Sequence, residues 1–182
     1  MTAIARPEGD DREADGAGQG TFKHGYALVI GVDQNAVTSW SLPAVTHDVL
    51  ALRETLVDPR RCGYPEGNVR VLTGKDATRS KIEQELERLR GCIERDSEAT
   101  AVVYFSGHGH RVWSPGTGKQ EYFLLPYDVR AIDSNGQLVP NTETALPAVV
   151  FARKIEEIEP QRLLVVLDCC HAGGMGAIRY FN

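Results

Sequence analysis

The chain has 182 residues, a length typical of one domain rather than two. Hydrophobic residues make up 42% of the sequence, enough for a substantial core. Lys and Arg number 20 against 25 Asp and Glu, which gives a net charge of −5. No block of basic residues offers a surface for a nucleic-acid backbone, so we expect no nucleic-acid partner.

Export and membrane signals are missing from the sequence. No apolar run approaches the roughly 18 residues of a membrane-spanning helix, and the N-terminus does not resemble a secretory signal. We therefore predict a cytoplasmic protein without a membrane partner. In that compartment Cys62, Cys92, Cys169 and Cys170 are expected as reduced thiols, and their spacing is not the C-x-x-C spacing of a zinc site.

Composition divides the chain into a tail and one domain. Residues 1–21 contain five acidic residues, two arginines and almost no large apolar side chain, so we predict a disordered acidic tail. Residues 22–182 are predicted to form the folded domain. Its pattern alternates between strands and helices, which indicates an α/β protein.

Four continuous apolar runs predict strands that are buried on both faces of a parallel sheet. Between them, apolar side chains recur at helical spacing. For the second helix, Ser80 with Glu83 fits a capping box, and Thr78 is an alternative first cap. The predicted strands are 26–32, 69–73, 101–106 and 163–168, and the predicted helical stripes are 45–56, 82–93 and 151–158.

This alternation favours a three-layer α/β/α sandwich with right-handed crossovers. Residues 107–147 are rich in Gly, Pro, Asn and Asp and contain one strand-like run, 122–125. We expect that segment to form loops with one short hairpin.

Reactive residues follow two of the predicted strands. The third strand ends in Ser-Gly-His-Gly-His, residues 106–110, and the fourth in Asp-Cys-Cys-His-Ala-Gly-Gly, residues 168–174. Carboxyl ends of parallel strands meet at one edge of a sheet, where ligands bind. An imidazole there can activate a thiol, so the pattern predicts a Cys–His nucleophilic site. The backbone N–H groups of Gly109 and Cys170 are candidate oxyanion donors.

Together these motifs resemble the large subunit of caspase-fold peptidases, and most of all metacaspases and bacterial caspase-like proteins. The resemblance is carried by YALVIGV, by Leu42 to Asp48, by YFSGHG and by VVLDCCHAGG. It implies a cysteine endopeptidase with His108 as catalytic histidine and Cys170 as nucleophile. It also implies a mostly parallel sheet with flavodoxin-like strand order.

Substrate preference can be argued from charge. Asp168 lies two residues before Cys170, so the two side chains share one side of the strand, and a carboxylate there attracts a cation. The resemblance implies a first specificity pocket made by Asp48, Ser106 and Asp168, and cleavage after Arg or Lys.

Three features depart from the metacaspase pattern. Val45 stands where a cysteine is common, so one side of the pocket differs. The stretch after the histidine loop offers only Glu121 and Asp128 as acidic ligands, too few for a convincing calcium site, and the predicted chemistry requires no cofactor. The sequence stops 12 residues after Cys170, so the small-subunit strands are expected to come from a partner fragment or from the missing C-terminal part of the same polypeptide.

Other interpretations are weaker. His110, Cys169 and His171 are the alternatives to the proposed pair, but alternation directs Cys169 and His171 away from the side of Cys170. A metal cluster is disfavoured because adjacent ligands cannot easily share one tetrahedral ion; its candidate ligands are His108, His110, Cys169, Cys170 and His171. Nucleotide binding is disfavoured because no phosphate-binding glycine motif is present. The main rival is a non-catalytic caspase-homology module for assembly or signalling.

Overall fold

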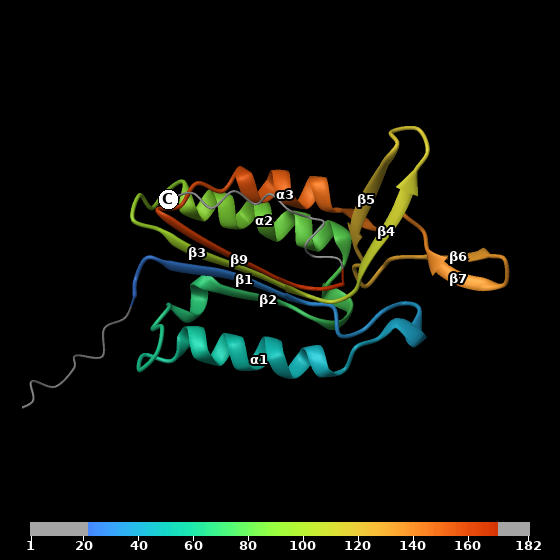
Figure 1. Ribbon diagram of the computed structural model, residues 1–182. Coiled ribbons are helices and arrows are strands. Elements are labelled where there is room, and N and C mark those ends of the chain that lie inside the picture. Colours follow the sequence, from blue (N-terminus) through green and yellow to red (C-terminus); the bar gives the residue numbers. More distant parts are fainter. Residues whose placement is uncertain (1–21, 171–182) are drawn as a thin grey trace, which may run out of the picture.

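The computed structural model describes residues 22–170. The predicted tail at 1–21 and residues 171–182, which include His171, lie outside the described residues. Four parallel strands form the central sheet in the order β2-β1-β3-β9 (Figure 1). They are β1 (Gly25–Gly31), β2 (Val69–Leu72), β3 (Thr100–Ser106) and β9 (Arg162–Asp168).

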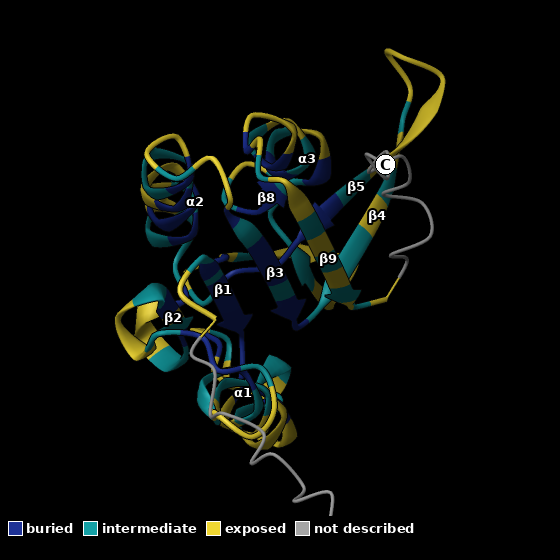
Figure 2. Ribbon diagram, turned by 90° about the vertical axis from the view of Figure 1, so that its left-hand side faces the viewer, coloured by how far each residue is buried: buried dark blue, intermediate teal, exposed yellow. Residues whose placement is uncertain are grey.

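Helices cover both faces of this sheet. Helix α1 (Ala44–Val57) lies on one face, and α2 (Arg79–Ile93) and α3 (Ala148–Glu156) lie on the other (Figures 1 and 2). The predicted three-layer sandwich with flavodoxin-like strand order is confirmed. Thr78, not Ser80, caps α2, because its side-chain oxygen accepts the Lys81 N–H. Three short 3-10 helices, Thr38–Trp40, Glu66–Asn68 and Gly74–Asp76, lie in the connections.

The core has two layers because side chains alternate along β1. Leu28 and Ile30 pack with residues of α2 and α3, whereas Val29 packs with Val45 and Val49 of α1. All five side chains are buried. The continuous apolar run in the sequence is therefore needed for the central strand, which contacts helices on both sides.

The prediction of burial on both faces is wrong for the two edge strands: in β2 Arg70 is exposed, and β9 is exposed along one face. Along β9 exposed and half-buried residues alternate, and Leu164 and Val166 are 53% and 38% exposed. On this face of the sheet, helix α1 packs on β1 and β2, and no helix of residues 22–170 covers β9. Figure 2 shows this alternation on β9 beside β1 and β3, which are mostly buried.

The segment between β3 and α3 contains more strand than expected. Strands β4, β5 and β8 form a small antiparallel sheet, and β6 and β7 form a separate hairpin. An Asn135-Gly136 turn with positive φ at both residues closes β6 and β7, which is a hairpin signal that the sequence interpretation overlooked. The bounds are β4 (Gly109–Ser114), β5 (Lys119–Leu124), β6 (Ala131–Ser134), β7 (Gln137–Pro140) and β8 (Leu146–Pro147).

Candidate active site

The carboxyl ends of β3 and β9 are held side by side. Ser106 pairs with Asp168 in the parallel register. The Ser106 hydroxyl donates to Asp168 Oδ2 at 3.0 Å, and the Gly107 N–H donates to the Asp168 carbonyl at 3.2 Å. His108 and Cys170 each lie two residues beyond these paired positions. The structure thus brings the two predicted segments to one edge of the sheet.

The main chains of Gly109 and Cys170 are in direct contact. A Cβ atom built on Gly109 would lie 2.1 Å from the Cys170 carbonyl oxygen and 3.1 Å from its carbonyl carbon. Only a residue without a side chain fits there, because backbone atoms cannot move aside as a flexible side chain can. The two residues that are predicted to donate to the oxyanion are therefore in backbone contact.

The two adjacent cysteines differ in environment. Cys170 is exposed, whereas Cys169 is half-buried and packs against the core cluster of α2 and α3. Burial disfavours the Cys169 thiolate, and the nearby charges of Cys170 and Asp168 add to this effect, so the pKa of Cys169 is raised to about 11. This environment makes Cys169 a poor nucleophile at neutral pH.

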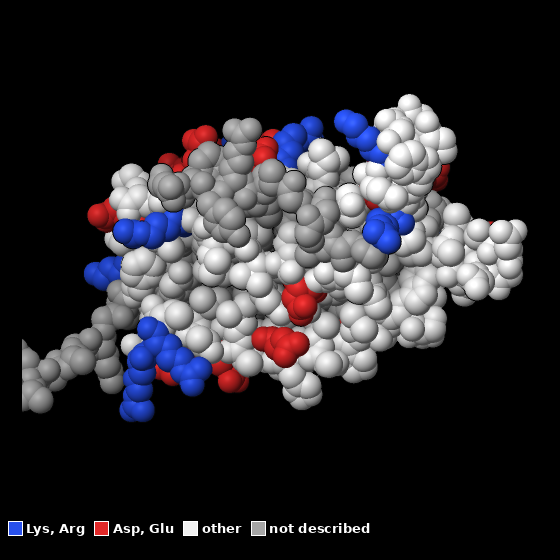
Figure 3. All heavy atoms as spheres, in the orientation of Figure 1, with Lys and Arg blue, Asp and Glu red and all other residues white. Residues whose placement is uncertain are grey.

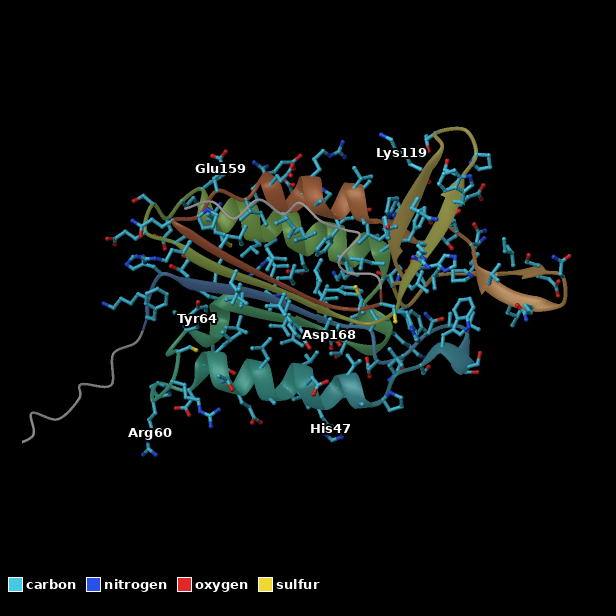
Figure 4. The ribbon with its side chains drawn as sticks, in the orientation of Figure 1. His47, Arg60, Tyr64, Lys119, Glu159 and Asp168 are labelled. Atoms are coloured by element: carbon cyan, nitrogen blue, oxygen red, sulfur yellow. The ribbon has the colours of Figure 1, made fainter. Side chains whose placement is uncertain are left out.

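An open cavity of about 580 Å³ lies beside these residues. It is lined by the N-terminal part of α1 and the ends of β3 and β9, and includes Asp48, Ser106, His108, Asp168 and Cys170. Ser106 is buried, whereas Asp48 and Asp168 are exposed. Figure 4 shows Asp168 at the end of the sheet facing α1, and Figure 3 shows acidic atoms there with no Lys or Arg between them.

Asp48 lies in the second turn of α1, since the helix begins at Ala44 and has no acidic residue in its first turn. Asp48, Ser106 and Asp168 line the same cavity. The three predicted pocket residues are thus brought together.

Tyr104 belongs to the same region and was missed from sequence. Burial is the main cause that raises its pKa; the carboxylates of Asp168 and Asp48 raise it too, while a hydrogen bond with Ser106 lowers it. A signal was available, because Tyr104 lies two residues before Ser106 and therefore shares its face of β3.

Asp33, which follows β1, was also missed. It is 7% exposed, and its carboxylate accepts the Gly74 N–H at 2.6 Å and the Thr46 hydroxyl at 2.9 Å. Its carbonyl accepts the Leu42 N–H at 2.8 Å. Asp33 therefore ties the start of α1, where the cavity is lined by Leu42, to the loop after β2.

The remaining predicted residues are elsewhere. His110 lies on β4 opposite Phe123. Glu121 is exposed on β5, and Asp128 accepts the Arg79 N–H at the start of α2. Residues 22–170 contain no group of three or more His, Cys, Asp or Glu side chains that could hold a metal ion.

Within the described part of the chain, no helix is both long enough and apolar enough to cross a membrane.

A family model described as "Caspase domain" matches residues 24–179.

Curated proteins with similar sequences are metacaspases. The chain is 27% identical to Metacaspase-2 of Trypanosoma brucei brucei over 157 residues. This match covers 82% of the chain and 42% of that protein. It is also 27% identical to Metacaspase-3 of the same organism and to Metacaspase-4 of Arabidopsis thaliana, covering 40% and 34% of those proteins. The chain thus spans less than half the length of these relatives. Because the family model covers most of the chain and the sheet has the expected strand order, the protein belongs to the caspase-domain family.

Proposed function

We propose that the protein is a cysteine endopeptidase that cleaves after Arg or Lys, with Cys170 as nucleophile and His108 as its acid and base. The single observation that carries this proposal is the junction at the sheet edge. The hydrogen bond between Ser106 and Asp168 and the backbone contact between Gly109 and Cys170 support it, because they hold the two segments that carry the thiol, the imidazole and the backbone donors at one edge.

The proposed reaction has two halves. His108 takes the proton of the Cys170 thiol, and the thiolate attacks the scissile carbonyl carbon, so that the π electrons of the carbonyl move onto oxygen, where the N–H groups of Gly109 and Cys170 stabilise the negative charge. The tetrahedral intermediate then collapses to a thioester and expels the amine, which takes the proton from His108. In the second half His108 removes a proton from water, the hydroxide attacks the thioester, and the intermediate releases the carboxylic acid and the Cys170 thiolate, which takes the proton back from His108.

The cavity supports specificity for a cation. Its carboxylates, Asp48 and Asp168, reach it from α1 and β9, and the hydroxyl of Ser106 holds Asp168 in place. None of the described residues that line the cavity is a lysine or arginine. An arginine or lysine side chain would therefore gain charge pairing and hydrogen bonds there.

Turnover of an arginyl peptide reporter by the purified full-length protein tests the chemistry. We expect Cys170→Ala and His108→Ala each to abolish turnover and Cys169→Ala to retain it. A fully active Cys170→Ala protein contradicts the assignment of the nucleophile.

Asp168→Ala tests the pocket. We expect it to reduce cleavage after Arg far more than it lowers the free energy of unfolding, because Asp168 is exposed and its loss leaves no cavity in the core. An unchanged preference for Arg would place the specificity pocket elsewhere.

We also propose that the small-subunit segment, as a separate fragment or as the C-terminal part of the same polypeptide, covers β9. Beside Leu164 and Val166, a cavity of about 420 Å³ is lined by apolar residues such as Leu52, Val102 and Tyr104. Among the described strands β9 has a neighbour on one side only, so its other edge has unpaired backbone groups. Mass spectrometry of the full-length product tests this: we expect residues beyond Asn182, and a chain that ends there and is active alone would contradict it.

No step of this mechanism uses a metal or cofactor, and we propose that calcium is not required. Turnover that is unchanged by a calcium chelator is the expected result, and loss of turnover that calcium restores would contradict it. A cytoplasmic location is proposed with it; cell fractionation tests that part.

The second candidate is a non-catalytic caspase-homology module. It is favoured only if purified protein with intact Cys170 and His108 turns over no basic peptide.

A further inference from the structure

The strand that leads away from the candidate site has an open edge. β4 begins at Gly109, directly after His108, and lies at one end of the β4-β5-β8 sheet. No other strand of residues 22–170 pairs with its outer side. Figure 1 shows β4 and β5 standing away from the end of the central sheet.

The register shows which backbone groups this edge presents. Gly109 lies opposite Leu124, and the Leu125 N–H donates to the His108 carbonyl at 3.0 Å. In an antiparallel pair this pattern marks Gly109 and Leu124 as residues that do not bond each other. The same holds two and four residues along β4, so Gly109, Arg111 and Trp113 direct their N–H and C=O groups outward.

Side chains on the same face add chemistry to this edge. Gly109, Arg111 and Trp113 share one face because side chains alternate along a strand. At Gly109 this face meets the backbone of Cys170. Arg111 is exposed and forms no ion pair with another described residue, and Trp113 is 59% exposed. Along β4, the contact with Cys170 is therefore followed by an arginine that has no ion-pair partner among residues 22–170 and by an exposed indole.

We propose that this edge binds the part of the substrate that follows the scissile bond, as an added parallel strand. The inference rests on the proposed peptidase activity. The Gly109 N–H that stabilises the oxyanion then makes the first hydrogen bond between β4 and the substrate strand. The second substrate residue after the bond donates its N–H to the Gly109 carbonyl, and its own carbonyl accepts the Arg111 N–H.

The direction of the substrate strand follows from the proton transfer between His108 and the leaving amine. His108 must reach the leaving amine, and the chain continues from His108 straight into β4, so the leaving half of the substrate lies along this strand. The half before the bond is anchored by the acidic cavity on the side of α1. Only a parallel strand extends outward from the bond along β4.

This register assigns a substrate class. The third residue after the bond lies beside Arg111 and the fifth beside Trp113. Charge complementarity then favours an acidic residue at the third position, and the exposed indole favours an apolar or aromatic residue at the fifth. The predicted substrate is a basic residue followed by an acidic and apolar segment.

Peptides that contain one arginine and differ only at the third residue after it, Asp against Lys, test the inference. With the full-length protein we expect kcat/KM to be about threefold to tenfold higher for the Asp peptide. Arg111→Ala should remove this preference and Arg111→Glu should reverse it. Arg162→Ala is the matched control, because Arg162 is exposed at the opposite end of β9, and it should keep the preference.

Trp113→Pro, compared with Trp113→Ala so that both variants lack the indole, tests the backbone part of the edge. Proline removes an outward N–H without removing a hydrogen bond to β5, so Trp113→Pro should reduce the advantage of a peptide with five residues after the bond over one with two further than Trp113→Ala does; equal effects would show that this N–H does not bind substrate.

The outcomes separate this inference from the proposed function. If wild-type protein cleaves an arginyl aminocoumarin reporter but shows no preference at the third residue after the bond, the edge does not bind substrate and the peptidase proposal stands. A preference that appears only at residues before the bond overturns the proposed direction. If the reporter is not cleaved at all, both proposals fail.

Discussion

Replacing Gly109 by alanine tests the junction on which the proposed function depends. The added methyl carbon would lie 2.1 Å from the Cys170 carbonyl oxygen, and contacts below 3.0 Å are essentially never seen for a Cβ atom. The obstacle is backbone, so the two peptide units must separate by about 1 Å. Such a shift moves both the Gly109 N–H and the nucleophile out of position.

A displacement of this size costs about 100-fold in rate when it affects a reacting group, and the loss of one oxyanion donor costs about 100-fold to 1,000-fold. We therefore expect Gly109→Ala to lower kcat/KM for the arginyl reporter by at least about 100-fold. The thermal unfolding midpoint reports separately on stability, so a folded but inactive protein is the expected outcome.

Gly116→Ala is the matched control. Gly116 lies in the β4–β5 turn, and a Cβ atom there would meet nothing within 4 Å. We expect this variant to keep the activity of the wild type. If Gly109→Ala also keeps wild-type kcat/KM, the contact between Gly109 and Cys170 does not form part of a catalytic site.

Three further predictions concern other parts of the molecule. Because the pKa of Cys169 is raised to about 11, only about one Cys169 thiol in a thousand is ionised at pH 8. Iodoacetamide should therefore label Cys170 well before Cys169 in a time course followed by peptide mass spectrometry. Equal labelling rates in the folded protein would contradict the burial of Cys169. The hydrogen bond with His24 lowers the pKa of Asp96 from its ordinary value of 3.8, so the stability it contributes is present above that value and is lost as pH falls through the lower folded pKa. Asp96→Asn should therefore lower the thermal unfolding midpoint at pH 7, by an amount that shrinks below about pH 4, and a difference that does not depend on pH would refute the argument. Gly31→Ala would place a Cβ atom 2.4 Å from Val49 Cγ2 and should lower the free energy of unfolding, measured by urea denaturation, by about 1–3 kcal/mol. Gly91→Ala on α2 meets nothing within 4 Å and should raise the free energy of unfolding by about 0.5–1 kcal/mol. If Gly31→Ala is the more stable variant of the two, β1 and α1 are not packed this closely.

Local patterns determined the main elements of this protein. The apolar runs placed β1 and β3 correctly because central parallel strands are apolar on both faces. The run at β2 was also placed correctly, although Arg70 on this edge strand is exposed. Spacing of apolar residues placed the three helices, since each buries one stripe. The Ser-Gly-His-Gly and Asp-Cys-Cys-His segments indicated where chemistry belongs, because both follow strands that end at one edge.

Tertiary structure decided what depends on neighbours. The sequence of β9 reads as apolar on both faces, yet Leu164 and Val166 are exposed because no described helix reaches them. Tyr104 lies close enough to the Asp168 carboxylate, 64 positions away, for its charge to raise the pKa of Tyr104, and Asp33 accepts a hydrogen bond from Thr46, 13 positions away. The close contact of Gly109 with Cys170, and the open edge of β4, are likewise set by how separate strands are juxtaposed, which no local spacing in the sequence encodes.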